Sequence, residues 1–170
     1  QERKDDVTLL RVIMANYILE GIYFYSGFMF FYNLGRGGKM PGSVQEIRYI
    51  NRDANTHLWL FRNMIGELRK EEPQLFTPEM VGMLKSMLEE GVAQEIQWGS
   101  YVIGDDVPGL TSEMVTDYIR YLGNLRWSGL GFGTLYEGYD EEPESMKWVN
   151  QYSNANMGKT DFFEAKSTAY

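Results

Sequence analysis

The sequence predicts an all-α protein in which long antiparallel helices form a bundle, followed by an extended C-terminal tail. Apolar residues recur at helical spacing through most of the first 135 of the 170 residues. Capping residues and loops rich in glycine and proline separate these segments. Strand-like alternation of useful length and internal repeats are both missing from the sequence. We therefore expect one domain, with the helices in residues 1–135 and a flexible tail in residues 136–170.

The first expected helix covers residues 7–33 and ends in an aromatic run over residues 23–32. A helix that is apolar nearly all round is central to its fold. Glu20 is a lone carboxylate within this helix, and a buried carboxylate without a partner costs several kcal/mol. Its partner is therefore expected to be a cation, a metal ion or a proton, although an arginine or a hydroxyl would satisfy it equally well.

The second expected helix follows the basic loop of residues 35–42. Ser43 is expected to cap it, with Glu46 completing a capping box. The helix should run to about Lys70, because Pro73 disfavours helical backbone before it.

Two further helices have clear starting signals. Thr77 is expected to cap a third helix, with Pro78 in its first position, that continues to about Ile103. Thr111 is expected to cap a fourth, which ends near residues 129–133. The residues after 136 are acidic and then rich in Asn, Ser, Gly and Lys, which is typical of an extended or partly disordered tail.

Composition excludes several functional classes. A net charge of −8 without a basic stretch argues against nucleic-acid binding. The most apolar segment, residues 18–32, contains a glutamate and two glycines and is too short for a bilayer core of about 30 Å, so no membrane is expected. The chain has no cysteine and no signal-peptide pattern, so we expect a cytoplasmic protein.

His57 is the only histidine of the chain. On a helix it shares a face with Ala54, one turn earlier, and Asp53 lies about 100° round the axis from Ala54. Bundle proteins with a carboxylate-bridged dimetal site use a Glu-x-x-His pair at this spacing. The glutamate of that pair is replaced by alanine here. Two antiparallel helices joined by a short loop would bring residues 20 and 54 together across a bundle.

Four segments together resemble the C-terminal half of the radical-generating small subunit of class I ribonucleotide reductase, a ferritin-like family. They are residues 19–28 (LEGIYFYSGF), 38–42 (GKMPG), 50–58 (INRDANTHL) and 160–170 (TDFFEAKSTAY). The resemblance covers nearly the whole chain. It implies half of a ferritin-like helical bundle and an oxidoreductase subunit that delivers a radical for reducing ribonucleotides to deoxyribonucleotides in DNA precursor synthesis.

The resemblance also implies roles for individual residues. Glu20 and His57 would be ligands of the second ion of a dinuclear iron or manganese/iron centre. Asp53 would be a relay residue that orients the other iron-ligating histidine. Tyr170, with Glu164 nearby, would pass the radical to the large catalytic subunit. The apolar pocket that shields the radical would contain Phe24, Phe28 and Ile50.

The sequence departs from the family pattern in two ways. It contains neither the family's first aspartate ligand, nor its first Glu-x-x-His helix, nor its radical tyrosine. Our hypothesis is a split subunit, in which another chain supplies this N-terminal half and an oligomer results. Such a half would also cover the apolar helix of residues 23–32, which is too apolar for a free surface.

The second departure is Ala54 itself, and it leaves three alternatives open. Water fills the gap and metal still binds; or the site holds a radical without metal; or the substitution is engineered or marks an inactive paralogue. In the last case the chain would be a redox-inactive scaffold or regulator of the reductase. An unrelated helical interaction domain is disfavoured, because the loop, ligand and tail motifs occur in the family's order.

Overall fold

The computed structural model describes residues 2–153, and every regular element among them is helical, which confirms the all-α prediction. The α-helices are α1 (Glu2–Gly21), α2 (Tyr25–Arg36), α3 (Pro41–Glu71), α4 (Pro78–Ile103), α5 (Ser112–Gly129) and α6 (Asn150–Ser153). Two short 3₁₀ helices accompany them, η1 (Pro73–Leu75) and η2 (Glu144–Val149). Glu164 and Tyr170 lie outside the described residues.

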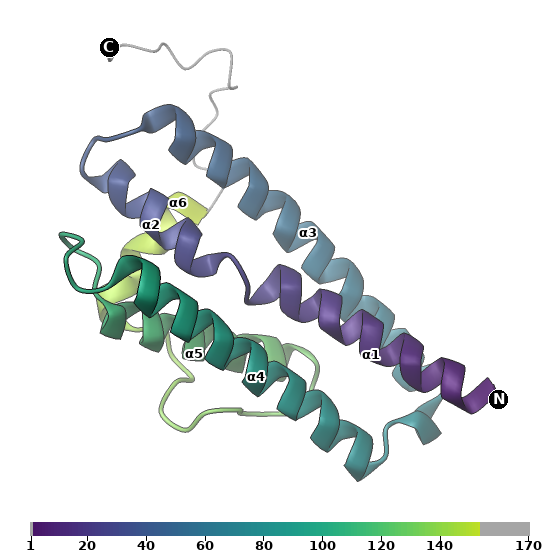
Figure 1. The fold of residues 1–170 in the computed structure, drawn as a ribbon. Helices are drawn as coiled ribbons and strands as arrows, with labels where there is room; N and C mark the ends of the chain where they lie inside the picture. Colours follow the sequence, from purple (N-terminus) through teal and green to yellow (C-terminus); the bar gives the residue numbers. More distant parts are fainter. Residues whose placement is uncertain (1, 154–170) are drawn as a thin grey trace.

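The long helices run up and down the molecule. Figure 1 shows α1 and α2 following one another along one line, with α3 returning antiparallel beside them and α4 running back again. Both α1 and α2 pack on α3, and α4 packs on α5. The expected long antiparallel helices are therefore present, and residues far apart in the chain meet between α1 and α3.

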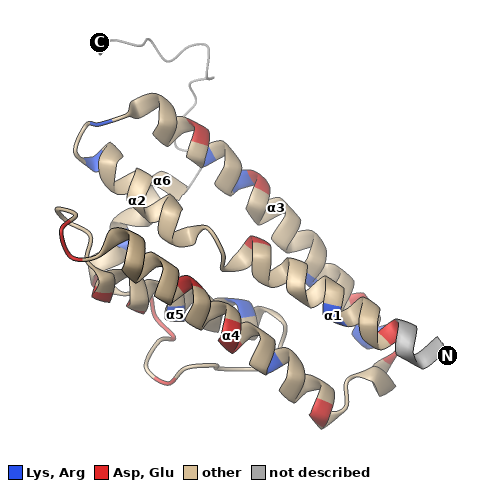
Figure 2. Cartoon of the chain, in the orientation of Figure 1, with Lys and Arg blue, Asp and Glu red and all other residues tan. Residues whose placement is uncertain are grey.

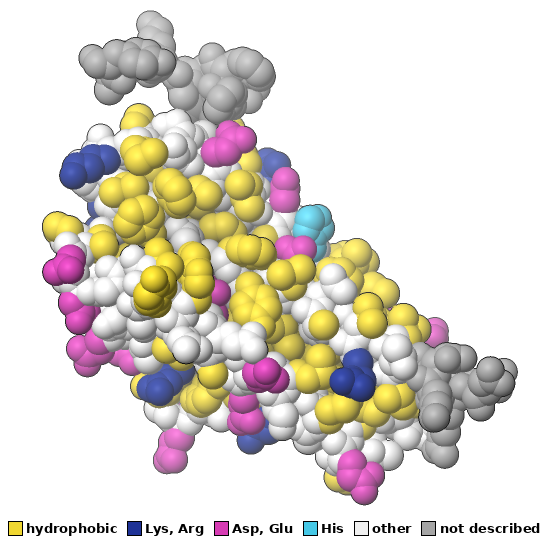
Figure 3. Space-filling view, in the orientation of Figure 1, with side chains coloured by type: hydrophobic (Ala, Val, Ile, Leu, Met, Phe, Trp, Pro, Cys, Tyr) yellow, Lys and Arg dark blue, Asp and Glu magenta, His cyan; other side chains and the backbone are white. Residues whose placement is uncertain are grey.

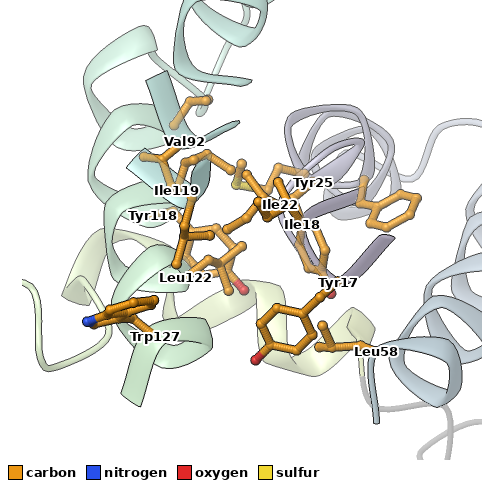
Figure 4. Packing of buried hydrophobic residues seen from close by; sticks show 14 of the residues in the cluster. Tyr17, Ile18, Ile22, Tyr25, Leu58, Val92, Tyr118, Ile119, Leu122 and Trp127 are labelled. Carbon is orange, nitrogen blue, oxygen red and sulfur yellow. The ribbon is translucent and has the colours of Figure 1, made fainter. Parts of the chain in front are cut away.

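The hydrophobic core lies where α1 and α2 meet α4 and α5. Figure 4 shows side chains from these helices pointing toward one another, with Leu58 of α3 reaching them from the other side. Tyr17 is fully buried, and its hydroxyl donates to the backbone carbonyl of Arg126 at 2.9 Å. Each large apolar side chain buried in this way contributes about 1.5–3 kcal/mol relative to its exposed state.

The first predicted helix is wrong in one respect: it is two helices. The chain leaves α1 after Gly21 and enters α2 at Tyr25, with Phe24 in the left-handed region at φ 74°. Apolar periodicity continues across the break, because Ile22 and Tyr25 are both buried in the same core. The sequence pattern therefore reads as one helix although the backbone hydrogen bonds are interrupted.

The helix starts were predicted with mixed success. Thr77 accepts a hydrogen bond from Met80 N at 3.2 Å and Thr111 accepts one from Met114 N at 3.3 Å, so both predicted caps are confirmed. The predicted cap at Ser43 is wrong. The helix begins at Pro41, whose fixed φ suits the first helical position.

The described part of the expected tail is folded. Met146 and Val149 of η2 are buried against the bundle. The guanidinium of Arg36 lies 4.3 Å from the ring centroid of Trp148, and Tyr152 stacks on Tyr32 at 5.7 Å. The folded region therefore extends well past residue 136.

One described stretch, residues 6–36, is long and apolar enough to cross a membrane by length and composition alone. It is broken between α1 and α2, and its buried side chains belong to the protein core. Core helices of soluble proteins pass the same test, so this stretch is weak evidence for a membrane span.

Candidate functional site

Two of the predicted site residues meet between α1 and α3. Glu20 lies in the last turn of α1, His57 lies in the middle of α3, and Glu20 Oε1 is 3.2 Å from His57 Nδ1. The Glu20 side chain is 23% exposed and that of His57 is 54% exposed. The antiparallel packing of α1 on α3 thus produces a carboxylate–imidazole pair that opens to the surface.

The position one turn before His57 contributes no donor. Ala54 is 8% exposed, and its methyl group has no metal-ligating atom. Among residues 2–153, no group of three or more His, Cys, Asp or Glu side chains lies together as a metal site would require. The described part of the chain therefore supplies two donors, one carboxylate and one imidazole.

The other predicted residues are dispersed. Asp53 is exposed and pairs with the Arg52 guanidinium at 3.0 Å. Phe28 is buried, with its ring 5.2 Å from that of Tyr25. Phe24 and Ile50 are 57% and 49% exposed, so the three residues of the expected apolar pocket do not enclose a site among the described residues.

The pair lies within an exposed apolar surface, which we call the α1–α3 face. On α3 its members follow helical spacing with His57 and are Ile50, Leu60 and Met64. On α1 they are Leu9, Val12 and Leu19. Figure 3 shows the histidine beside acidic side chains and hydrophobic areas, and Figure 2 shows how few charged residues α2 carries. Contiguous apolar surface around a polar pair marks an interaction site.

Sequence reasoning missed two buried polar groups, Asn51 on α3 and Glu95 on α4. Asn51 lies on α3 one turn before Ala54, and its Nδ2 donates to the Tyr32 hydroxyl at 2.9 Å. Burial raises the pKa of Tyr32 to about 12, against the opposing effect of this hydrogen bond. The second group is Glu95 of α4, which is 4% exposed. Neither stands out in the sequence, because asparagine and glutamate on a helix are usually on its solvated face.

A pocket of about 430 Å³ adjoins the end of α1. Its walls come from the last turn of α1, the segment before α2, and α4; they are Leu19, Tyr23, Phe24, Gln94, Glu95 and Trp98. Tyr23 and Gln94 join the two sides through a hydrogen bond of 2.6 Å. The pocket lining is mostly apolar, and one of its residues, Leu19, immediately precedes Glu20 in the chain.

Comparison with known proteins gives consistent results. The sequence model of the family described as "Ribonucleotide reductase, small chain" matches residues 1–143. Over its whole length the chain is 71% identical to the ribonucleoside-diphosphate reductase subunit beta of Treponema pallidum, and the match covers 48% of that protein. Over 96% of its length it is 43% identical to the corresponding subunit of Halalkalibacterium halodurans, of which the match covers 47%.

Solved structures agree with these relatives. The R2 subunit of ribonucleotide reductase from Clostridium botulinum superposes with a TM-score of 0.81 at 49% identity, over 85% of this chain and 45% of that one. A structure titled as a putative class I ribonucleotide reductase from Bacillus halodurans gives a TM-score of 0.79 at 37% identity, over 89% of this chain and 58% of the other. The chain spans about half the length of the curated relatives it matches.

Proposed function

The chain belongs to the ribonucleotide reductase small-chain family, and from this premise we propose that it forms part of the subunit that generates and delivers a radical for ribonucleotide reduction. One observation carries the proposal to the level of residues. Glu20 and His57, the two ligands that the resemblance implied, face each other at 3.2 Å across α1 and α3.

The distance between the two donor atoms suits a shared cation. Ligands about 2.1 Å from one metal ion and at roughly a right angle lie about 3 Å apart. Imidazole and carboxylate are also donors that iron and manganese accept. Glu20 and His57 would therefore hold one ion of an iron or manganese/iron centre, together with ligands from the remaining half of the family's length. When bound, the metal centre supplies one-electron oxidation chemistry.

The chain's own residues have further proposed tasks. The α1–α3 face would be covered by the remaining half, which excludes water and reductants from the site. Phe24, Phe28 and Ile50 would shield the radical. Asp53 would belong to the radical-transfer relay. Glu164 and Tyr170 would carry the radical onward to a large catalytic subunit. A tyrosine suits this task because its phenol loses a proton and an electron together.

The assembly that follows from these tasks has at least two partners. We place the remaining half against the α1–α3 face, either on the same polypeptide or on another, and the large catalytic subunit at residues 154–170. The chain with its remaining half is called the assembled protein below. We place it in the cytoplasm, where ribonucleotide reduction supplies DNA precursors.

Ala54 favours a second candidate function. Without a carboxylate at this position the described residues offer two metal donors, which is fewer than a stable site requires. In this alternative the chain is a redox-inactive paralogue that keeps the bundle surface and acts as a scaffold or regulator of the reductase. A radical held without metal would be a third state, and the same measurement separates it.

Metal content and electron paramagnetic resonance of the assembled protein test the proposal. We expect about two metal ions per assembled protein, or a tyrosyl-type signal without metal. His57→Ala should abolish binding of the ion that Glu20 and His57 would hold. Thr56→Ala, which alters an exposed neighbour whose hydroxyl donates to the Arg52 carbonyl, should not. Neither metal nor radical in the unaltered protein would reject radical generation and favour the scaffold.

A further inference from the structure

The junction between α1 and α2 is a strained point of the fold beside the candidate site. Phe24 adopts φ 74° and ψ −11° at the position that precedes α2, and its side chain does not cap the helix. A residue other than glycine in this region costs about 1–2 kcal/mol. Such a conformation persists only where the surrounding structure holds it in place. Figure 1 shows the break directly after the end of α1.

A buried carboxylate from α4 holds the start of α2. Glu95 is 4% exposed, and its Oε1 accepts a hydrogen bond from the Ser26 amide at 2.9 Å. Burial raises the pKa of Glu95, and the Phe24 amide, which also donates to this carboxylate, offsets part of that rise. Amides at a helix start are otherwise unpaired and carry a partial positive charge, so a carboxylate there is stabilising.

A cation from α5 holds the end of α1. Arg126 Nε donates to the Gly21 carbonyl at 3.0 Å, and its Nη2 donates to the Tyr25 hydroxyl at 3.1 Å. Carbonyl groups at a helix end are unpaired and carry a partial negative charge, which a guanidinium complements. A carboxylate from α4 therefore binds the start of α2, and a guanidinium from α5 binds the end of α1. Each charge is opposite to the partial charge of the helix end that it binds.

Glycines let α4 come close enough for this contact. Gly91 and Gly99 lie one turn before and one turn after Glu95, on the same helix face. A Cβ at Gly91 would lie 2.5 Å from Ile18 Cγ2, and one at Gly99 would lie 2.5 Å from Ser26 Oγ. The backbone of α4 thus approaches both α1 and α2, and places Glu95 between the two contacts.

We propose that Glu95 and Arg126 are positioning residues that clamp the α1–α2 junction and thereby hold Glu20 opposite His57. Glu20 immediately precedes Gly21, whose carbonyl Arg126 binds, so a shift of the junction moves the Glu20 side chain along α3. The inference rests on the proposed function for the importance of Glu20. The clamp itself acts on the backbone and requires no metal.

The test uses Glu95→Gln in the assembled protein, with two measurements that do not depend on activity. Hydrogen exchange of the Phe24 and Ser26 amides reports the clamp. The ring-proton resonance of His57 at one fixed pH, identified by its loss in His57→Ala, reports the position of Glu20. Glu20→Gln provides the reference shift for an imidazole that has lost its carboxylate neighbour.

We expect Glu95→Gln to raise exchange at both amides by roughly tenfold, because a hydrogen bond to a charged acceptor is replaced by one to a neutral acceptor. It should also move the His57 resonance toward its position in Glu20→Gln. Glu89→Gln is the control, because on the same helix it removes a surface ion pair with Lys85 instead. Arg126→Lys, which keeps the charge but not the two-pronged contact, should act like Glu95→Gln.

Unchanged exchange in both clamp variants would overturn the clamp. Faster exchange with an unmoved His57 resonance would overturn the positioning of Glu20. Metal binding by the unaltered assembled protein is measured separately. Its absence would reject the proposed function, while the two readouts above would still decide the clamp.

Discussion

Ala54 is the single residue on which the chemistry of the candidate site depends most. It lies one turn before His57, is 8% exposed, and stands where the resemblance implies a carboxylate ligand. A glutamate there would place a second carboxylate near Glu20, and the repulsion between the two would be relieved by a cation.

We therefore predict that Ala54→Glu tightens manganese(II) binding to the assembled protein by at least roughly tenfold, as measured by equilibrium dialysis. The variant's thermal stability should also become metal-dependent, because ligands that bind only the folded state stabilise it. Ala93→Glu adds the same charge at an exposed position of α4 and serves as the control. Equal affinity in the two variants would show that residue 54 does not face the metal.

Tyr32 makes stability depend on pH in the alkaline range. Its pKa is raised to about 12 by burial, above the ordinary value near 10. Between these values the folded chain keeps the phenol proton and the unfolded chain loses it. The stabilisation is complete below about pH 10 and is lost as pH rises to about 12, which amounts to roughly 3 kcal/mol.

The variant Tyr32→Phe should lack this part of the pH dependence. At about pH 8 it should be less stable by roughly 1–3 kcal/mol, because Asn51 Nδ2 loses its buried acceptor. The difference in free energy of unfolding between the variant and the unaltered chain should close or reverse by about pH 12. Denaturant titrations of both proteins measure it. A constant gap across this range would mean that Tyr32 titrates normally in the folded state.

At the scale of elements, the glycines of α4 have opposite expected effects according to their neighbours. A Cβ at Gly91 would lie 2.5 Å from Ile18 Cγ2, whereas one at Gly82 would have nothing within 4 Å. Ile18 is buried and has little room to move. The two positions therefore separate helix propensity from helix packing within a single helix.

We predict that Gly91→Ala lowers the free energy of unfolding by about 1–3 kcal/mol through overpacking. Gly82→Ala should raise it by about 0.5–1 kcal/mol, because alanine is the better helix former at an unobstructed position. Denaturant unfolding of both variants provides the measurement. A stabilising Gly91→Ala would show that α4 is not held close to α1.

At the scale of the whole molecule, the α1–α3 face is the surface on which we propose that the remaining half packs. Leu60 is 49% exposed on α3, in the row that contains His57. Burying a leucine at an interface contributes about 1.5–3 kcal/mol. A charged residue at this point would remain without a partner when the interface forms.

Leu60→Asp should therefore weaken binding of the remaining half, supplied as a separate polypeptide, by roughly tenfold or more in a calorimetric titration. Leu125→Asp provides the control, since Leu125 is a 39% exposed leucine on α5, a helix that contributes no residue to the face as defined. If both variants bind as tightly as the unaltered chain, the remaining half is attached elsewhere.

The sequence by itself determined the helical fold and the identity of the paired residues. Local signals were sufficient for Thr77 and Thr111, because a cap depends on a side chain and an amide three residues later. The Glu20–His57 contact was also predictable in outline, because two antiparallel helices joined by a short loop place their residues opposite one another.

Only the tertiary structure decided the break after Gly21, the burial of Glu95 and the folding of residues 144–153. Each depends on groups distant in sequence. The break is held by Glu95 and Arg126 from other helices, and Trp148 is ordered against Arg36. Apolar spacing specifies which face of a helix is buried, but it does not encode which distant charge reaches a backbone group, and that partner determines where the helix ends.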